Sequence, residues 1–150
     1  MSATAAVWYL LAHNTPLLTG LGTVSGVAPI ARIKEADALP INILFPAILV
    51  RRTDRVPRTT LAMAVSGRQH RERVQVMSHV KLSEASPGGG GKRACDALIA
   101  LCLAALPNQW ATINGVKVQA ILPDIVSPDL SDIPTGIHAA SQDFIVQWIE

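Results

Sequence analysis

The sequence predicts a single domain that contains both helices and β-strands, and three observations support this prediction. The chain has 150 residues, a length that suits one domain with a sizeable hydrophobic core. Apolar residues recur at helical spacing in two segments and alternate with polar residues, as in strands, in several others. An Asn-Gly pair separates two of the strand-like segments, which is a strong hairpin signal. We therefore treat residues 1–150 as one domain.

The N-terminal part of the chain predicts a short amphipathic helix followed by irregular structure. In residues 4–13, four apolar side chains share one side at helical spacing. They are Ala5, Trp8, Leu11 and Ala12. Thr15 and Pro16 then have the pattern of an N-cap and first position of a short second helix. Residues 19–38 contain too much glycine and proline for a helix, and only residues 27–33 alternate weakly as a strand.

Two strands are predicted in the middle of the chain, with a long connection between them. Residues 47–53 form an apolar run that ends in charged residues and begins directly after Pro46, which is typical of a central strand. Residues 71–80 alternate, and the face that we expect to be buried carries Val74, Val76 and Val80. The connection, residues 54–70, is too long for a tight turn. It could be an extended hairpin arm that projects from the sheet, because long loops in compact domains tend to be functional or disordered.

A loop, a helix and further strands are predicted in the remainder of the chain. Residues 83–91 include four successive glycines and are expected to form a flexible loop. Residues 92–106 have the period of a helix that is apolar nearly all round, so we expect the sheet and a neighbouring subunit to cover it. Asn114-Gly115 predicts a hairpin. Residues 123–136 are then predicted as a loop, and residues 141–150 as a closing strand.

Charge is scarce and unevenly distributed. Only 16% of the residues are charged, against roughly 25% in average soluble domains, which hints at self-association. Residues 51–93 carry ten basic and three acidic side chains, whereas the last 57 residues carry one basic and six acidic ones. Opposite patches on one chain suit a head-to-tail contact between identical subunits, which can close into a ring. The alternative is pairing within one chain, together with a solvated arginine-rich loop.

Several function classes lack the residues that they need. No apolar stretch reaches the roughly 20 residues of a membrane-spanning helix, and no Lys or Arg precedes the apolar N-terminal run, so we expect no membrane partner and synthesis in the cytoplasm. Cys95 and Cys102 lie too far apart on the predicted helix for a disulfide and are expected to be buried. The glycines before Lys92 do not match a phosphate-binding loop. The four histidines are scattered, and we expect no metal, no cofactor and no catalytic site.

The arginine-rich middle of the chain could contact phosphates. The stacking aromatic residues of single-strand binders are absent there, and no helix-turn-helix or zinc-finger pattern is present. We therefore expect no sequence-specific nucleic-acid binding, while contact with passing DNA or with an acidic protein partner stays open.

The predicted segments follow one another in a recognisable order. They are the helix of residues 4–13, a passage rich in glycine and proline, the strand Phe45-Pro46-Ala47-Ile48-Leu49-Val50, the strand Arg73-Val74-Gln75-Val76, the helix of residues 94–106, the hairpin Asn114-Gly115-Val116, and the strand Gln142-Asp143-Phe144-Ile145-Val146-Gln147-Trp148. This order resembles that of the tail terminator, or tail completion, proteins of long-tailed bacteriophages, and it covers most of the chain. Two segments depart from the family pattern: residues 54–70 are longer, and residues 83–91 are richer in glycine.

The resemblance implies an α+β domain with a mostly antiparallel sheet of about four strands and helices packed on one face. It also implies a ring-forming subunit in the neck of the virion tail. Six copies would cap the head-proximal end of the tail tube, stop tube polymerisation and provide the head-tail joining surface, with no reaction catalysed. The implied partners are other copies of the chain, the major tail tube protein, head-tail connector proteins, and DNA that passes through the channel without sequence-specific binding.

Two other function classes compete with this interpretation. One is another neck or tail protein, such as a tail tube subunit or a head-tail adaptor. The other is a small hydrolase or nucleic-acid-binding protein, which the missing motifs disfavour.

Nine charged residues are the candidate interaction residues. We expect six arginines to face a partner or the channel, and these are Arg51, Arg52, Arg55, Arg58, Arg68 and Arg71. We expect three aspartates to line the complementary subunit edge, and these are Asp124, Asp129 and Asp132.

Overall fold

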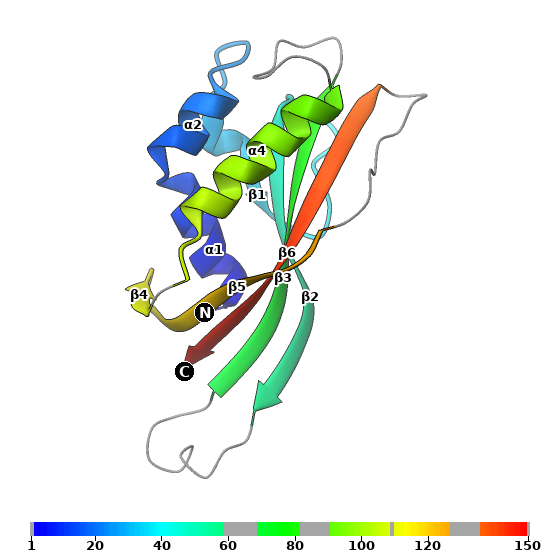
Figure 1. Cartoon of the computed structure of the whole chain (residues 1–150). Coiled ribbons are helices and arrows are strands. Elements are labelled where there is room, and N and C mark those ends of the chain that lie inside the picture. The colour runs from blue at the N-terminus through cyan, green and yellow to red at the C-terminus, as the bar shows by residue number, and fades with distance from the viewer. Residues whose placement is uncertain (1, 59–68, 82–90, 109, 127–135, 150) are drawn as a thin grey trace.

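The computed structural model describes residues 2–58, 69–81, 91–108, 110–126 and 136–149, with the backbone alone described at residues 54–58. It has an α+β fold in which one twisted sheet carries its helices on one face (Figure 1). The sheet has six strands in the order β1-β2-β3-β6-β5-β4. We call the face that contacts the helices the inner face and the opposite one the outer face.

Two capped helices begin the chain. Helix α1 spans Ala3–Ala12, and the Ser2 hydroxyl accepts a hydrogen bond from the Ala5 amide at 3.3 Å. Helix α2 spans Thr15–Leu21. Its N-cap is Asn14, whose side-chain oxygen accepts from the Leu17 amide at 3.0 Å, so the cap lies one residue before the predicted Thr15. Asparagine and serine are among the best N-cap residues because their oxygens satisfy free amides of the first turn.

The prediction of a weak strand at residues 27–33 is mostly wrong. A 3-10 helix occupies Pro29–Arg32, and strand β1 comprises only Ile33–Glu35. Arg32, which the sequence did not single out, is buried. Its guanidinium donates to the carbonyls of Pro46 at 2.7 Å and Leu21 at 3.1 Å, and also to that of Gly22. The charge therefore satisfies carbonyls at the C-terminal end of α2, where the helix dipole favours a cation, and ties this end to the start of β2.

Strands β2 (Ala47–Arg58) and β3 (Gln69–Lys81) form a long antiparallel pair. Pairing runs from Ala47 opposite His79 to Arg58 opposite Gln69, with an irregularity between Arg52 and Asp54. Both predicted strands are confirmed and are longer than expected. The ends of the expected arm, residues 54–58 and 69–70, are paired strand that continues beyond the helices (Figure 1). The rest of the arm, residues 59–68, lies outside the described residues.

Helix α4 (Gly91–Ala105) follows the predicted glycine-rich loop and confirms the predicted helix. Residues 83–90 lie outside the described residues, but Gly91 is buried as the first residue of α4 and does not belong to a loop. A Cβ on Gly91 would lie 2.0 Å from the His138 ring, so no other side chain fits at this contact between α4 and the sheet.

The last three strands complete the sheet. They are β4 (Ala111–Ile113), β5 (Val116–Val126) and β6 (Ile137–Ile149). Asn114 and Gly115 both have positive φ, which confirms the predicted two-residue hairpin between β4 and β5. The loop expected at residues 123–136 begins later than predicted, because β5 continues through Pro123 to Val126.

The expectation of about four strands was too low. Strands β1 and β4 add a three-residue segment at each side of the four long ones. Strand β1 runs parallel to β2, and the other pairs are antiparallel. Segments this short carry too few residues for a periodic pattern, and their partners stabilise them.

The core lies between the inner face and the three α-helices. It includes Leu11 of α1, Leu17 of α2, Leu98 of α4, and Val74 and Phe144 of the sheet. The two cysteines are free and buried, and burial raises the pKa of the Cys102 thiol to about 12. In the described part of the chain, no helix has both the length and the apolar character needed to cross a membrane.

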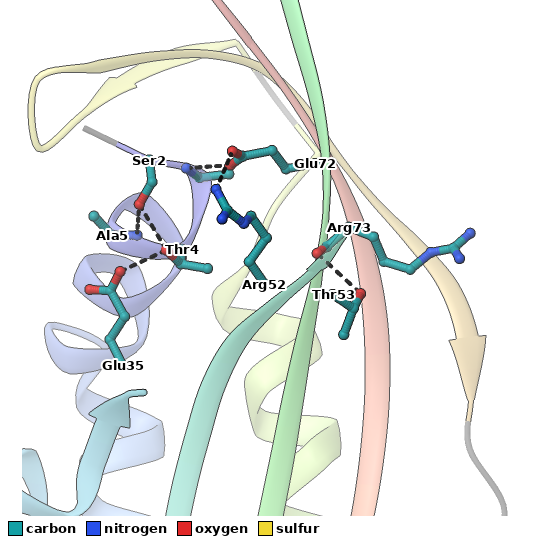
Figure 2. A network of polar contacts seen from close by, with 9 residues as sticks. Ser2, Thr4, Ala5, Glu35, Arg52, Thr53, Glu72 and Arg73 are labelled. Carbon is teal, nitrogen blue, oxygen red and sulfur yellow. Dashed lines mark hydrogen bonds and ion pairs between the residues drawn. The ribbon is translucent and has the colours of Figure 1, made fainter. Parts of the chain in front are cut away.

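A buried carboxylate on the inner face joins α1 to the sheet. Glu72 of β3 is fully buried, and its Oε2 accepts a hydrogen bond from the Ala3 amide at 2.8 Å (Figure 2). Its Oε1 lies 3.8 Å from Nη1 of Arg52, a side chain that is 51% exposed. Free amides and the positive end of the helix dipole both favour a negative charge at this end of α1.

We predict that Glu72→Ala lowers the free energy of unfolding by about 2–3 kcal/mol, because the Ala3 amide loses a charged acceptor inside the fold. Urea unfolding followed by circular dichroism measures this loss. Glu35→Ala is the matched control. Glu35 is exposed and accepts from the Thr4 hydroxyl at 2.6 Å, so its loss should cost less than about 1 kcal/mol. Equal losses in the two variants would contradict the anchoring role of Glu72.

Candidate interaction surfaces

The structure gathers the candidate arginines on the β2–β3 pair. Arg51 and Arg52 are consecutive in β2 and therefore point to opposite faces of the sheet. Arg52 reaches toward the start of α1 on the inner face (Figure 2). On the outer face, Nε of Arg51 donates to Oε1 of Gln75 at 2.7 Å. Both guanidinium groups thus have partners in their own chain and also line the molecular surface.

The remaining candidate arginines are placed by register. Arg55 and Arg58 lie opposite Glu72 and Gln69 in the backbone pairing, and Arg71 lies between Val56 of β2 and Gln147 of β6. Arg68 lies outside the described residues. Arg55, Arg58 and Arg71 therefore lie at the end of the sheet at which β2 and β3 extend beyond the helices, whereas Arg51 and Arg52 lie in the middle of β2 (Figure 1).

The candidate aspartates are not gathered in the same way. Asp124 lies on β5, and its carboxylate accepts from Nη2 of Arg73 at 2.8 Å in a partly exposed ion pair. At Asp124 the structure therefore has an ion pair within one chain, which is the alternative that we set against a contact between subunits. Asp129 and Asp132 lie outside the described residues. Sequence reasoning missed Arg73 as the partner, because the pair spans strand β6 and joins residues 51 positions apart.

A band of polar side chains crosses the outer face from β2 to β6. Gln75 links Arg51 to this band, and its amide nitrogen lies 3.5 Å from the Ser141 hydroxyl. Gln75, Ser141 and Asp143 are all buried, and Asp143 pairs in register with Gln75. Oδ1 of Asp143 has no hydrogen-bond partner among the described residues. Alternation in residues 71–80 predicted a polar outer face, but it gave no sign that this face would be buried.

A hollow of about 290 Å³ lies beside Arg51 and Arg52. The N-terminus of α1, the end of β1 and the middle of β2 form its walls. Its lining residues are Ser2, Thr4, Glu35, Ala36, Asp37, Val50, Arg51 and Arg52. Acids from the β1 end face arginines from β2, so the hollow carries both charges. Within the described ranges, no three His, Cys, Asp or Glu side chains group as metal ligands would.

His79 shares the outer face with Arg51. Burial, and to a smaller extent the nearby Arg51 charge, lowers the pKa of His79 from 6.5 to about 4. Its Nδ1 is buried without a hydrogen-bond partner in the described part of the chain. The ring is therefore neutral at pH 7.

We predict that His79 makes the fold sensitive to acid. Between pH 6.5 and about 4 the unfolded chain takes up a proton at His79 that the folded chain excludes, so stability falls as the pH falls through this window. His79→Gln should remove on the order of 2 kcal/mol of this loss. Urea unfolding at pH 7, 5.5 and 4.5 measures it, with His13→Gln at the exposed end of α1 as the control variant. If the free energy of unfolding fell equally with pH in the wild type and in His79→Gln, His79 would not be the source of the acid sensitivity.

Comparison with known proteins gives one clear result, which concerns the fold. No family model matches this sequence, and neither does any curated protein. The chain is similar to a chain in a solved structure described as the virion of a native gene transfer agent particle. The TM-score is 0.65 at 11% sequence identity, and the alignment covers 99% of this chain and 96% of the other. The two chains therefore share a fold over their whole lengths.

Proposed function

We propose that this chain is a structural virion protein that caps the head-proximal end of a tail tube as a hexameric ring. The observation that carries the proposal is the whole-length similarity of fold to a chain of a gene transfer agent virion. The order of segments, which resembles that of tail terminator proteins, supports the more specific role. The strand after Pro46, the Asn114-Gly115 hairpin and the C-terminal strand all lie where this resemblance implies.

The proposed mechanism is geometric and involves no reaction and no cofactor. The ring binds the last ring of the tube, covers its growing face and presents its other side to the head-tail connector. DNA passes through the central channel without sequence-specific contacts. The basic β2–β3 end of the sheet suits contact with an acidic partner or with DNA phosphates, because its arginines belong to the stretch that carries ten basic residues.

A tube-capping assay tests the proposal. Purified protein is added to polymerising tail tube subunits, and tube lengths are measured by electron microscopy. We expect tubes to stop growing, with one ring of this protein at one end. Open-ended fibres of the protein itself would identify a tube subunit, and binding to connectors but not to tubes would identify a head-tail adaptor. Either result would overturn the terminator role.

We predict that charge reversal at the β2 end weakens assembly. Arg55→Glu combined with Arg58→Glu should raise the concentration needed for ring formation or tube capping about tenfold at low salt, because steering and pairing by these charges are lost. The deficit should shrink as salt screens the wild-type contacts. Sedimentation and the capping assay at two salt concentrations measure both effects.

A matched control separates position from net charge. Lys92→Glu combined with Arg93→Glu makes the same change in charge at exposed positions at the start of α4. This variant should assemble like the wild type. An equal deficit in the two variants would mean that overall charge, and not the β2 end, determines assembly.

A further inference from the structure

Two strands of the sheet have a stretch of edge that no other strand covers among the described residues. Strand β1 pairs with β2 only at Ile48, Leu49 and Val50, although β2 continues to Arg58. On the opposite side of the sheet, β4 pairs with β5 only from Val116 to Val118, although β5 continues to Val126. The uncovered stretches, residues 51–58 and 119–126, have the same length and lie on opposite sides of one sheet.

The backbone of the β2 stretch is oriented for further pairing. The Val50 carbonyl accepts from the Ala36 amide at 3.2 Å, so it points toward the β1 side. Backbone groups alternate in direction along a strand, and the backbone of Arg52 therefore faces the same side, where β1 has ended. Such free backbone groups are a template for pairing with another chain.

A proline limits each uncovered stretch. Pro57 lies in β2 and Pro123 in β5, and proline cannot donate a ladder hydrogen bond. The segments that remain are residues 51–56 and residues 119–122. The shorter one spans roughly 13 Å at about 3.3 Å per residue, which is enough for a short strand pair.

The side chains on both sides of Pro123 mark the β5 edge as a contact surface. Leu122, Ile125 and Val126 are 37%, 51% and 69% exposed. Asp124 among them is already paired with Arg73. Exposed edge strands in natural proteins are usually protected by lysines or other charges, and this one exposes apolar side chains instead.

The β2 edge offers both space and complementary charge. The 290 Å³ hollow lies at Val50, Arg51 and Arg52, next to the point at which β1 ends, so a strand added in line with β1 would enter it. The β2 stretch belongs to the basic middle of the chain, and β5 leads into the acidic C-terminal part. The occupant that fits the β2 edge is the β5 edge of another copy, because it is the other uncovered stretch of the same sheet among the described residues and it carries an acid, Asp124, against the arginines of β2.

We propose that residues 51–56 of one copy pair with residues 119–122 of the next, so that the sheet continues from subunit to subunit. Because the two edges lie on opposite sides of the sheet, the contact is head-to-tail and leaves a free edge of each kind until the ring closes. The proposal rests on the proposed function in that it identifies the neighbour as another copy in a ring.

Cysteine cross-linking tests the contact. Thr53→Cys places a thiol within the β2 segment, where the native hydroxyl donates to the Arg73 carbonyl of β3 at 3.3 Å (Figure 2), and Leu122→Cys places one within the β5 segment; both native side chains are exposed. The native Cys95 and Cys102 are buried and should not react. A short bis-maleimide reagent, which tolerates a shift of a residue or two in register, is added to the full-length protein alone and on tail tubes.

We expect a mixture of the two single variants to give cross-linked dimers, and neither variant alone to do so. The double variant should give a ladder that ends at the ring size. Leu103→Cys, at an exposed apolar position on α4, replaces Leu122→Cys in the control mixture. The test mixture should give at least ~10-fold more dimer than the control, because only apposed edges hold the thiols at high effective concentration.

The possible failures separate the two proposals. Cross-linking of a single variant would show a symmetric contact, and cross-linking through residue 103 would place the contact on the helices; both would overturn the edge contact while the capping role stood. Tube capping by the wild type without any cross-link between residues 53 and 122 would also overturn the edge contact and leave the capping role standing. Cross-linked ladders of a protein that does not cap tubes would support the edge contact and overturn the capping role.

Discussion

The arrangement of helices on this sheet depends on one buried charge. Glu72 lies in a central strand of the sheet, and its carboxylate accepts from the Ala3 amide, the first amide of α1, which would otherwise be buried without this acceptor. This contact fixes the point at which α1 begins and, with it, the apolar side of α1 against the inner face. It also holds the half-exposed Arg52 over the same carboxylate. The position of the α1 start then sets one wall of the hollow beside β2.

Polar groups on the two faces of β3 serve different purposes. On the inner face, Glu72 satisfies a helix end, and the apolar residues that follow it at alternate positions form the core. On the outer face, Gln75 links Arg51 to Ser141, and Arg73 crosses β6 to reach Asp124. Together these bonds connect β2, β3, β6 and β5, so they hold the sheet together without a helix on that face. The band therefore joins β2, β3 and β6 through buried polar side chains on the outer face.

The long, periodic elements were predictable from sequence, and contacts between distant segments were not. The valines of residues 71–80, the helix of residues 92–106 and the Asn114-Gly115 turn depend on local patterns, and each prediction is confirmed. Strands β1 and β4 have three residues each, and their pairing with longer neighbours stabilises them. The burial of Glu72 and Arg32 could not be inferred, because charged residues normally lie at the surface and only the tertiary fold supplies their partners. The same holds for Asp124, whose partner Arg73 comes from two strands away.

The short length of β1 and β4 is the feature that connects fold to assembly. If either strand ran the full length of its neighbour, the corresponding edge would be closed and the chain would be a self-contained sheet. Two open edges on opposite sides of one sheet allow the sheet to continue into another copy, and this alone would also permit open fibres. Pro57 and Pro123 restrict the continuation to a few residues, so each backbone contact is weak and must be reinforced by side chains. In the proposed assembly each copy would make one contact through each edge, and a closed ring is the arrangement that leaves no edge free.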